Sequence, residues 1–158
     1  MTLRRRLRHD DGFTLIDLLA ALAIMALLAS MAVPAYNRFM ATLSLDTACR
    51  SLVSEIRTAQ QLALTQSVSW NLLFWMSDPQ GFFRSKNETS MPKDYPKLPP
   101  GITFDSIYSP SGLVLQFDSA GQLTKGSRTI GLVNNYGEKR YVIVTPVTGR
   151  ARISRTPS

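Results

Sequence analysis

The chain is poor in the side chains that most often carry chemistry. It has one cysteine, Cys49, and one histidine, His9, among 158 residues. A single cysteine excludes an intrachain disulfide. The sequence also has no glycine-rich phosphate loop and no Cys/His spacing typical of a metal site, and its carboxylates, such as Asp105 and Asp118, are scattered. We therefore expect a structural and binding protein rather than an enzyme, with no cofactor and no bound metal.

Acidic residues are scarce in the last quarter of the chain. Residues 119–158 contain a single acid, Glu138, against seven bases: Lys125, Arg128, Lys139, Arg140, Arg150, Arg152 and Arg155. A local excess of positive charge favours an anionic partner.

Charge is almost absent from a long apolar run near the N-terminus. Residues 13–36 are 24 residues with one ionisable side chain, Asp17. As a helix they would extend about 36 Å, which is enough to cross a bilayer. The preceding residues 1–12 carry four arginines, so we expect them to stay on the cytoplasmic side.

Two ordinary interpretations of this run stay open, a secretory signal peptide and an uncut membrane anchor. The small residues at 32–35 would suit a signal peptidase. The carboxylate of Asp17 at the start of the run argues against a secretory signal peptide, as does a helical pattern that continues beyond Pro34.

The junction resembles the class III signal of type IV prepilins and type II secretion pseudopilins. The resemblance rests on Gly12-Phe13-Thr14-Leu15-Ile16-Asp17-Leu18-Leu19. It implies that prepilin peptidase cuts between Gly12 and Phe13 and methylates Phe13. Pro34 also falls where such pilins commonly carry a helix-disturbing proline. One departure is Asp17, because the family usually has Glu at this position.

A carboxylate inside the apolar run needs a physical reason, because an Asp at mid-bilayer costs about 2.5 to 3.5 kcal/mol. A free Phe13 amine, with a pKa near 8, would be cationic and could pair with it. The resemblance implies that Asp17 pairs with the N-terminal amine of a neighbouring subunit during assembly. Asp17 could also complement its own helix N-terminus and its own amine, and the two interpretations are compatible.

The apolar run continues as an amphipathic helix over residues 37–67, with a kink or local melt expected at Pro34. Apolar positions recur every three or four residues, at Leu45, Cys49, Leu52, Val53, Ile56, Ala59 and Ala63. Arg50, Ser54, Arg57 and Gln61 fall on the other side. Cys49 lies on the apolar stripe, where we expect a buried, unreactive thiol.

Residues 68–158 have the pattern of a β-rich head. Branched and aromatic residues concentrate in five short runs, at 68–76, 102–108, 113–117, 129–133 and 140–145, separated by turn residues. They predict an antiparallel meander, with a proline-rich surface loop at 78–101. The predicted fold is α+β and pilin-like, a long N-terminal helix packed on an antiparallel β-sheet head.

The head is similar to the GspH/FimT minor pilins and pseudopilins. The similarity rests on residues 48–68, on residues 115–121 and on a terminal Gly149-Arg150-Ala151-Arg152. It implies a minor subunit of a type II secretion pseudopilus or a type IV pilus tip. Other pilins and the inner-membrane assembly platform would be its partners, and the head would lie in the periplasm on a single-pass anchor.

The basic tail suggests a second function. If residues 149–154 are extended, Arg150 and Arg152 lie on one face about 6.6 Å apart, and could hold successive phosphates. A Gly-Arg-x-Arg tail in some FimT-like pilins is associated with DNA capture in natural transformation. DNA is therefore a candidate partner, with Arg155, Lys139 and Arg140 as further candidate contacts. The alternatives are a solvated sheet edge or docking onto acidic neighbours in the filament tip.

Overall fold

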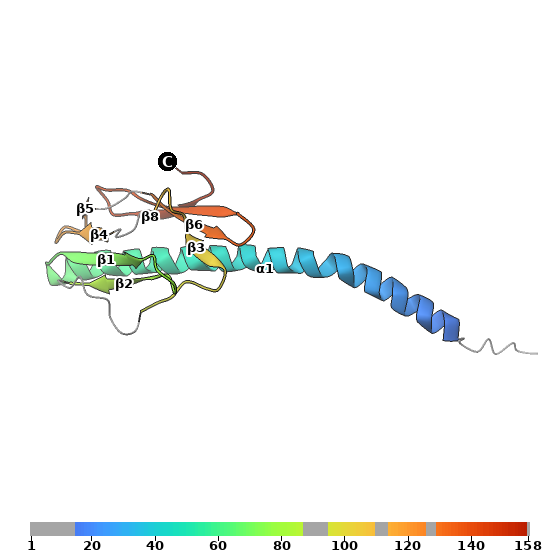
Figure 1. Ribbon diagram of the computed structural model, residues 1–158. Coiled ribbons are helices and arrows are strands. Elements are labelled where there is room, and N and C mark those ends of the chain that lie inside the picture. The colour runs from blue at the N-terminus through green and yellow to red at the C-terminus, as the bar shows by residue number, and fades with distance from the viewer. Residues whose placement is uncertain (1–14, 87–94, 110–113, 126–128, 158) are drawn as a thin grey trace, which may run out of the picture. The chain divides into compact units, whose positions relative to one another are not determined.

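The computed structural model describes residues 15–86, 95–109, 114–125 and 129–157. Its first element, α1, is one continuous helix from Leu15 to Gln66 (Figure 1). The helix ends where Ser67 adopts a left-handed backbone, with φ of 52°. The residues on both sides of Pro34 are helical, so the local melt expected at this proline is not observed.

The chain divides into two compact units, Met1–Asn37 and Arg38–Ser158. In the first unit, every described side chain is exposed. In the second unit, one stripe of α1 is buried and comprises Leu45, Ala48, Cys49, Leu52, Val53, Ile56, Ala59 and Ala63. The stripe predicted from the three- and four-residue spacing is therefore confirmed.

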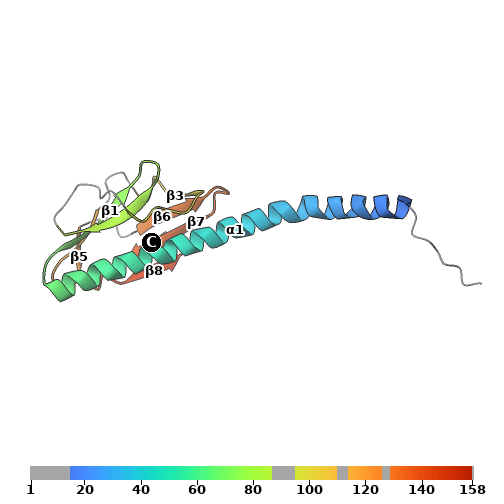
Figure 2. The same cartoon turned by 90° about the horizontal axis from the view of Figure 1, so that it is seen from below.

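The second unit contains two four-stranded antiparallel sheets. The first has the order β2-β1-β4-β5, with β1 at Trp70–Trp75, β2 at Gly81–Ser85, β4 at Val114–Phe117 and β5 at Leu123–Lys125. The second has the order β3-β6-β7-β8, with β3 at Ile102–Phe104, β6 at Thr129–Asn134, β7 at Lys139–Val144 and β8 at Ala151–Ser154 (Figure 2).

A simple meander is therefore wrong. Strands that follow each other pair in β1–β2, β4–β5, β6–β7 and β7–β8, but β1 also pairs with β4, and β3 pairs with β6. The chain crosses to the second sheet at β3, returns to the first at β4 and crosses again at β6. The order of the strands within each sheet therefore differs from their order in the sequence.

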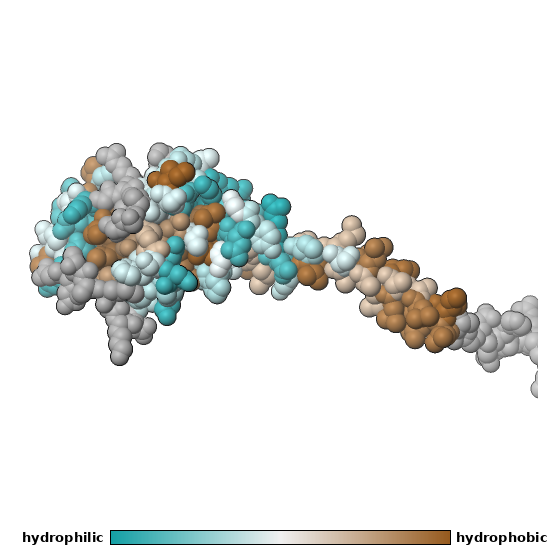
Figure 3. Space-filling view, viewed as in Figure 1, coloured by the Kyte–Doolittle hydropathy of each residue, from teal (hydrophilic) through white to brown (hydrophobic). Residues whose placement is uncertain are grey.

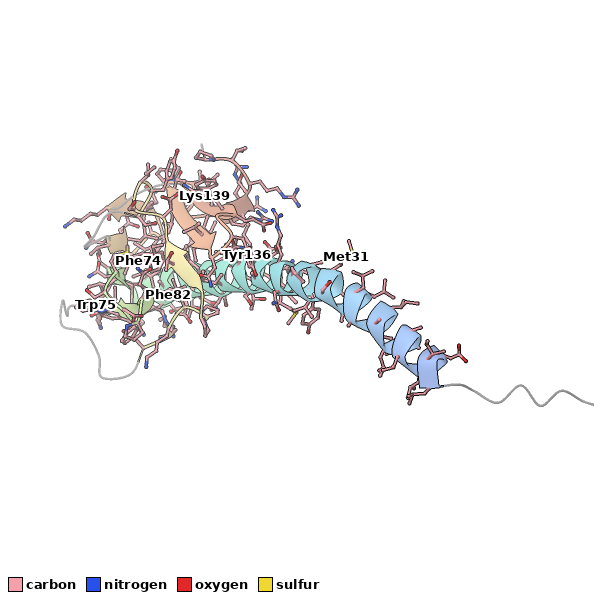
Figure 4. The ribbon with its side chains drawn as sticks, turned by 45° about the vertical axis from the view of Figure 1, so that its right-hand side comes forward. Met31, Phe74, Trp75, Phe82, Tyr136 and Lys139 are labelled. Atoms are coloured by element: carbon pink, nitrogen blue, oxygen red, sulfur yellow. The ribbon has the colours of Figure 1, made fainter. Side chains whose placement is uncertain are left out.

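The predicted surface loop at 78–101 is wrong for Gly81–Ser85, which form β2. Phe82 and Phe83 supply the reason, because both aromatic rings are buried. Phe82 lies opposite Phe74 of β1, and the ring centroids are 6.4 Å apart (Figure 4). The sequence pattern did not predict this strand, because only two large apolar residues mark it and prolines lie on both sides of it. Residues 87–94 of the predicted loop lie outside the described residues.

One hydrophobic core joins the helix to both sheets. The α1 stripe packs in one cluster with residues of the first sheet, including Leu72 and Leu115, and of the second, including Leu132 and Val142. Each such side chain, when fully buried, stabilises the fold by about 1.5 to 3 kcal/mol. The α+β, pilin-like architecture predicted from the sequence is thus confirmed, with a long helix packed against antiparallel sheets.

Candidate functional site

The N-terminal segment of α1, residues 15–37, presents apolar side chains in every direction. Leu15 is 77% exposed and Met31 is 72% exposed. None of the apolar stretch that makes α1 able to cross a membrane is buried. The apolar residues appear in brown in Figure 3. By length and composition, this segment can cross a membrane.

Asp17, the predicted assembly residue, and Pro34, the predicted helix-disturbing proline, lie on this segment. Asp17 is the acidic residue of the first turn of α1, where a negative charge complements the positive end of the helix dipole. Pro34 lies inside the helix. The predicted processing site, Gly12 and Phe13, lies outside the described residues.

A basic groove lies in the second unit, between α1 and β8. It has a volume of about 510 Å³ and is lined by three arginines with smaller side chains between them: Arg50, Val53, Ser54 and Arg57 from α1, and Ala151, Arg152 and Ile153 from β8. We call it the α1–β8 groove. β8 lies beside α1 in Figure 2. The three guanidinium groups give the groove a positive charge, and a guanidinium can bind a carboxylate or a phosphate through two hydrogen bonds.

A smaller pocket of about 260 Å³ continues the α1–β8 groove, because both are lined by Arg50 and Ile153. Arg140 and Arg155 add positive charge to this pocket, and Asp46 adds the one carboxylate. Arg140 Nε donates to Asp46 Oδ1 at 3.0 Å. Its charge is therefore partly neutralised, whereas Arg155 forms no ion pair with a described residue.

Lys139 is likewise paired. Its Nζ lies 2.8 Å from Asp105 Oδ2, and the Asp105 side chain is 5% exposed. The hydrogen bond from Lys139 lowers the pKa of Asp105 against the opposing effect of burial, and a backbone hydrogen bond from Ile107 lowers it further. The same contact with Asp105 raises the pKa of Lys139. Lys139 and Arg140, which the sequence suggested as candidate anion-binding residues, thus each form an ion pair within the head.

Arg150 and Arg152 occupy different settings. β8 begins at Ala151, so Arg150 precedes the strand and follows the left-handed Gly149, whose φ is 62°. Both arginine side chains are exposed, but Arg152 lines the α1–β8 groove and Arg150 does not. Ile153 lines this groove together with Arg152, although adjacent residues of a strand ordinarily point to opposite faces.

Two residues of the α1–β8 groove were missed by sequence reasoning. Arg50 and Arg57 were assigned only to the polar side of the helix, yet they lie across from Arg152 in the same groove. Their spacing held a usable signal, because residues seven apart lie on one helix face, with Ser54 between them. What sequence alone could not supply was the position of β8 beside that face.

The remaining candidates have structural surroundings. Cys49 is fully buried, and burial raises the pKa of its thiol to about 12, with a further upward effect from Asp46 and an opposing one from Arg140. Asp118 Oδ1 accepts hydrogen bonds from two backbone amides of the β4–β5 turn. Within the described residues, no group of three or more His, Cys, Asp or Glu side chains could hold a metal ion.

Comparison with known proteins finds a known motif in the N-terminal segment. Residues 7–33 match the prokaryotic N-terminal methylation motif. No curated protein and no solved structure matches the chain. The motif is that of type IV pilins and pseudopilins, whose members are structural proteins rather than enzymes, are processed by prepilin peptidase and assemble with other pilins. Together with the exposed apolar helix and the α+β head, it shows that the chain is a type IV pilin-like protein with an N-terminal methylation motif.

Proposed function

We propose that this protein is a minor pilin or pseudopilin, a structural subunit of a type II secretion pseudopilus or of a type IV pilus tip, of the GspH/FimT type. The observation that carries the proposal is that α1 has two parts with different exposure. Residues 15–37 of α1 are apolar and exposed, whereas the later turns of α1 are buried on one side by the head. An apolar helix of this kind suits both membrane insertion and packing against the helices of other subunits.

In this proposal, residues 1–12 are a leader, residues 13–36 cross the inner membrane and later pack in the filament, and residues 37–67 support a head formed by residues 68–158. Prepilin peptidase cuts between Gly12 and Phe13 and methylates Phe13. Removal of the leader creates a cationic amine four residues before Asp17, which offers charge pairing between subunits in a low-dielectric setting. The head is exposed to the periplasm before assembly.

Mass spectrometry of the protein from its native host tests the processing step. The expected mature species begins with N-methylated Phe13, and a host lacking prepilin peptidase should accumulate the full chain. A mature species that begins at any other residue overturns the proposal. In particular, cleavage near residues 32–35 would indicate an ordinary secretory signal.

Deletion of the gene distinguishes the two assemblies. Loss of twitching motility with normal secretion indicates a pilus subunit. Retention of secreted proteins in the periplasm with normal twitching indicates a pseudopilus subunit. Normal twitching together with normal secretion contradicts both assignments.

A second candidate function is DNA capture for natural transformation through the basic tail. The observation that favours it is that Arg150 and Arg152 are both exposed and form no ion pair with a described residue. About three phosphate contacts would give a slope near −2.1 to −2.7 in a plot of log affinity against log salt concentration. An affinity for DNA that does not change with salt concentration, or that is unchanged when both arginines are replaced, would exclude this function.

A further inference from the structure

The α1–β8 groove combines three arginines with apolar side chains from one helix and one strand. We propose that it binds an acidic polypeptide segment, with Arg50, Arg57 and Arg152 holding its carboxylates. The site thus combines two helix residues with one strand residue, and it does not include Arg150 of the tail.

The three arginines are available for a ligand. Arg50, Arg57 and Arg152 are exposed, and none of them forms an ion pair with another residue in the part of the chain that the structure describes. Three other arginines do form ion pairs with acidic residues, namely Arg38, Arg84 and Arg140. A guanidinium binds a carboxylate through two parallel hydrogen bonds, so each of the three can hold one acidic side chain.

The lining between the arginines favours polypeptide over nucleic acid. Val53, Ala151 and Ile153 give the groove an apolar surface, and Ile153 remains 40% exposed. The aliphatic side chains of a peptide can cover such a surface, whereas a sugar-phosphate backbone has few apolar groups that could do so. Proteins that bind single-stranded nucleic acid usually stack its bases on aromatic rings, and no aromatic residue lines this groove or the pocket that continues it.

The strand beside the groove also suits an extended peptide. β8 is the last strand of its sheet and pairs only with β7 among the described residues. An edge strand offers backbone groups to which an extended segment can add, while its side chains give specificity. Arg152 and Ile153 of β8 lie within the groove itself, so backbone pairing and carboxylate binding can occur at the same place.

Charge indicates which filament subunit would supply the segment, an identification that rests on the proposed function. This chain has a formal net charge of +7, of which the leader contributes +2, and residues 119–158 contain one acid against seven bases. Two copies would therefore repel each other at this surface, and like charges across an interface are unfavourable. The partner is a different, acidic subunit rather than a second copy of this chain.

Direct binding tests the site with a defined probe. Full-length protein in neutral detergent micelles is titrated into a fluorescently labelled peptide of twelve glutamates, and anisotropy is measured at low salt. Arg57→Glu and Arg152→Glu should each weaken binding by about tenfold or more, because each removes a charge-assisted contact. The matched control is Arg150→Glu, which makes the same charge change two residues away but outside the groove, and should change affinity by less than about threefold.

Three results overturn the proposal. The wild-type protein fails to bind the peptide, or Arg57→Glu binds it normally, or Arg150→Glu weakens binding as much as Arg57→Glu. A single-stranded oligonucleotide provides the fourth comparison. If it displaces the peptide and its own binding falls in Arg57→Glu, the groove is a nucleic-acid site instead. All four results leave the N-terminus of the mature protein untouched, so failure here is distinct from failure of the proposed function.

Discussion

The side chain of Gln60 is hydrogen-bonded to the backbone of Thr148, with 2.8 Å between Gln60 Nε2 and the Thr148 carbonyl oxygen. The same Nε2 donates to the carbonyl oxygen of Gly121 at 2.9 Å. Thr148 lies in the β7–β8 turn and Gly121 in the β4–β5 turn, so one helix side chain fastens a turn from each sheet. A third contact, from Leu123 N to the Pro146 oxygen at 2.9 Å, joins the start of β5 to the β7–β8 turn.

Replacement of Gln60 should loosen both turns at once. Gln60→Ala removes two hydrogen bonds, and each contributes about 0.5 to 1.5 kcal/mol. We expect the free energy of unfolding to fall by about 1 to 3 kcal/mol, measured by urea denaturation followed by circular dichroism. Gln61→Ala is the matched control, because this neighbouring glutamine is exposed. Equal stability of the two variants would show that the Gln60 contacts add nothing.

Gly149 should tolerate no side chain, because two effects combine there. Its φ is 62°, and a Cβ at this position would meet the Gln60 side chain and the Gly121 carbonyl oxygen. Gly149→Ala should therefore cost the left-handed backbone strain of about 1 to 2 kcal/mol and an overlap of about 1 to 3 kcal/mol in addition.

The control for Gly149 isolates these two effects. Gly137 has a φ of 77°, but a Cβ there would have no atom within 4 Å. Gly137→Ala should thus show the backbone strain alone. Unfolding midpoints that shift equally in Gly137→Ala and Gly149→Ala would contradict the close packing of Gly149 on α1.

The sequence predicts those features of the fold that depend on neighbours along the chain. The buried stripe through Leu52 and Ile56 follows from helical spacing alone, and the methylation motif lies within one continuous segment. The pairing of β1 with β4 depends on contacts about forty residues apart, such as Leu72 with Leu115, and no local pattern specifies it. The same limit applies to the groove, since the charges of Arg57 and Arg152 are evident in the sequence but their proximity is created by tertiary packing.

Cys49 should be unreactive in the folded protein. Its pKa is raised to about 12, chiefly by burial, so almost none of the reactive thiolate is present at pH 8. We expect iodoacetamide to label the native protein negligibly at pH 8 and to label it fully in 8 M urea, as measured by mass spectrometry. A variant with an exposed thiol, Ser51→Cys in a Cys49→Ala background, is the positive control. Rapid labelling of native Cys49 would contradict its burial in the core.

Acid should destabilise the head through two carboxylates. The pKa of Asp105 is lowered chiefly by its hydrogen bond with Lys139, and that of Glu138 chiefly by its hydrogen bond with the Thr42 hydroxyl. A folded-state pKa below the unfolded value means that the contribution to stability is complete above about pH 4 and is lost as the pH falls through the lowered values.

Lys139→Met tests this pH dependence. Without the ammonium, the pKa of Asp105 rises because burial is no longer opposed by Lys139, and the gap between its folded and unfolded values narrows. Lys139→Met should therefore be less stable than the wild type near pH 7 and should lose less stability as the pH falls. Urea midpoints measured between pH 7 and pH 2.5 report the change. Lys125→Met is the control, since this lysine is exposed at the end of β5 and forms no ion pair with a described residue. Identical pH profiles for wild type and Lys139→Met would exclude the proposed role of the Lys139–Asp105 pair.

Asp17 should matter for assembly and not for membrane insertion. Removing a carboxylate from an apolar helix makes insertion easier, whereas an assembling filament loses an attraction that low dielectric strengthens. Asp17→Ala should therefore fractionate with the inner membrane, mature normally and be missing from sheared filaments or from crosslinked tip complexes. Asp17→Glu keeps the charge and should restore incorporation, and Ser30→Ala, a neutral change in the same segment, should have no effect. Normal incorporation of Asp17→Ala would leave Asp17 only the local role of complementing the N-terminus of its own helix.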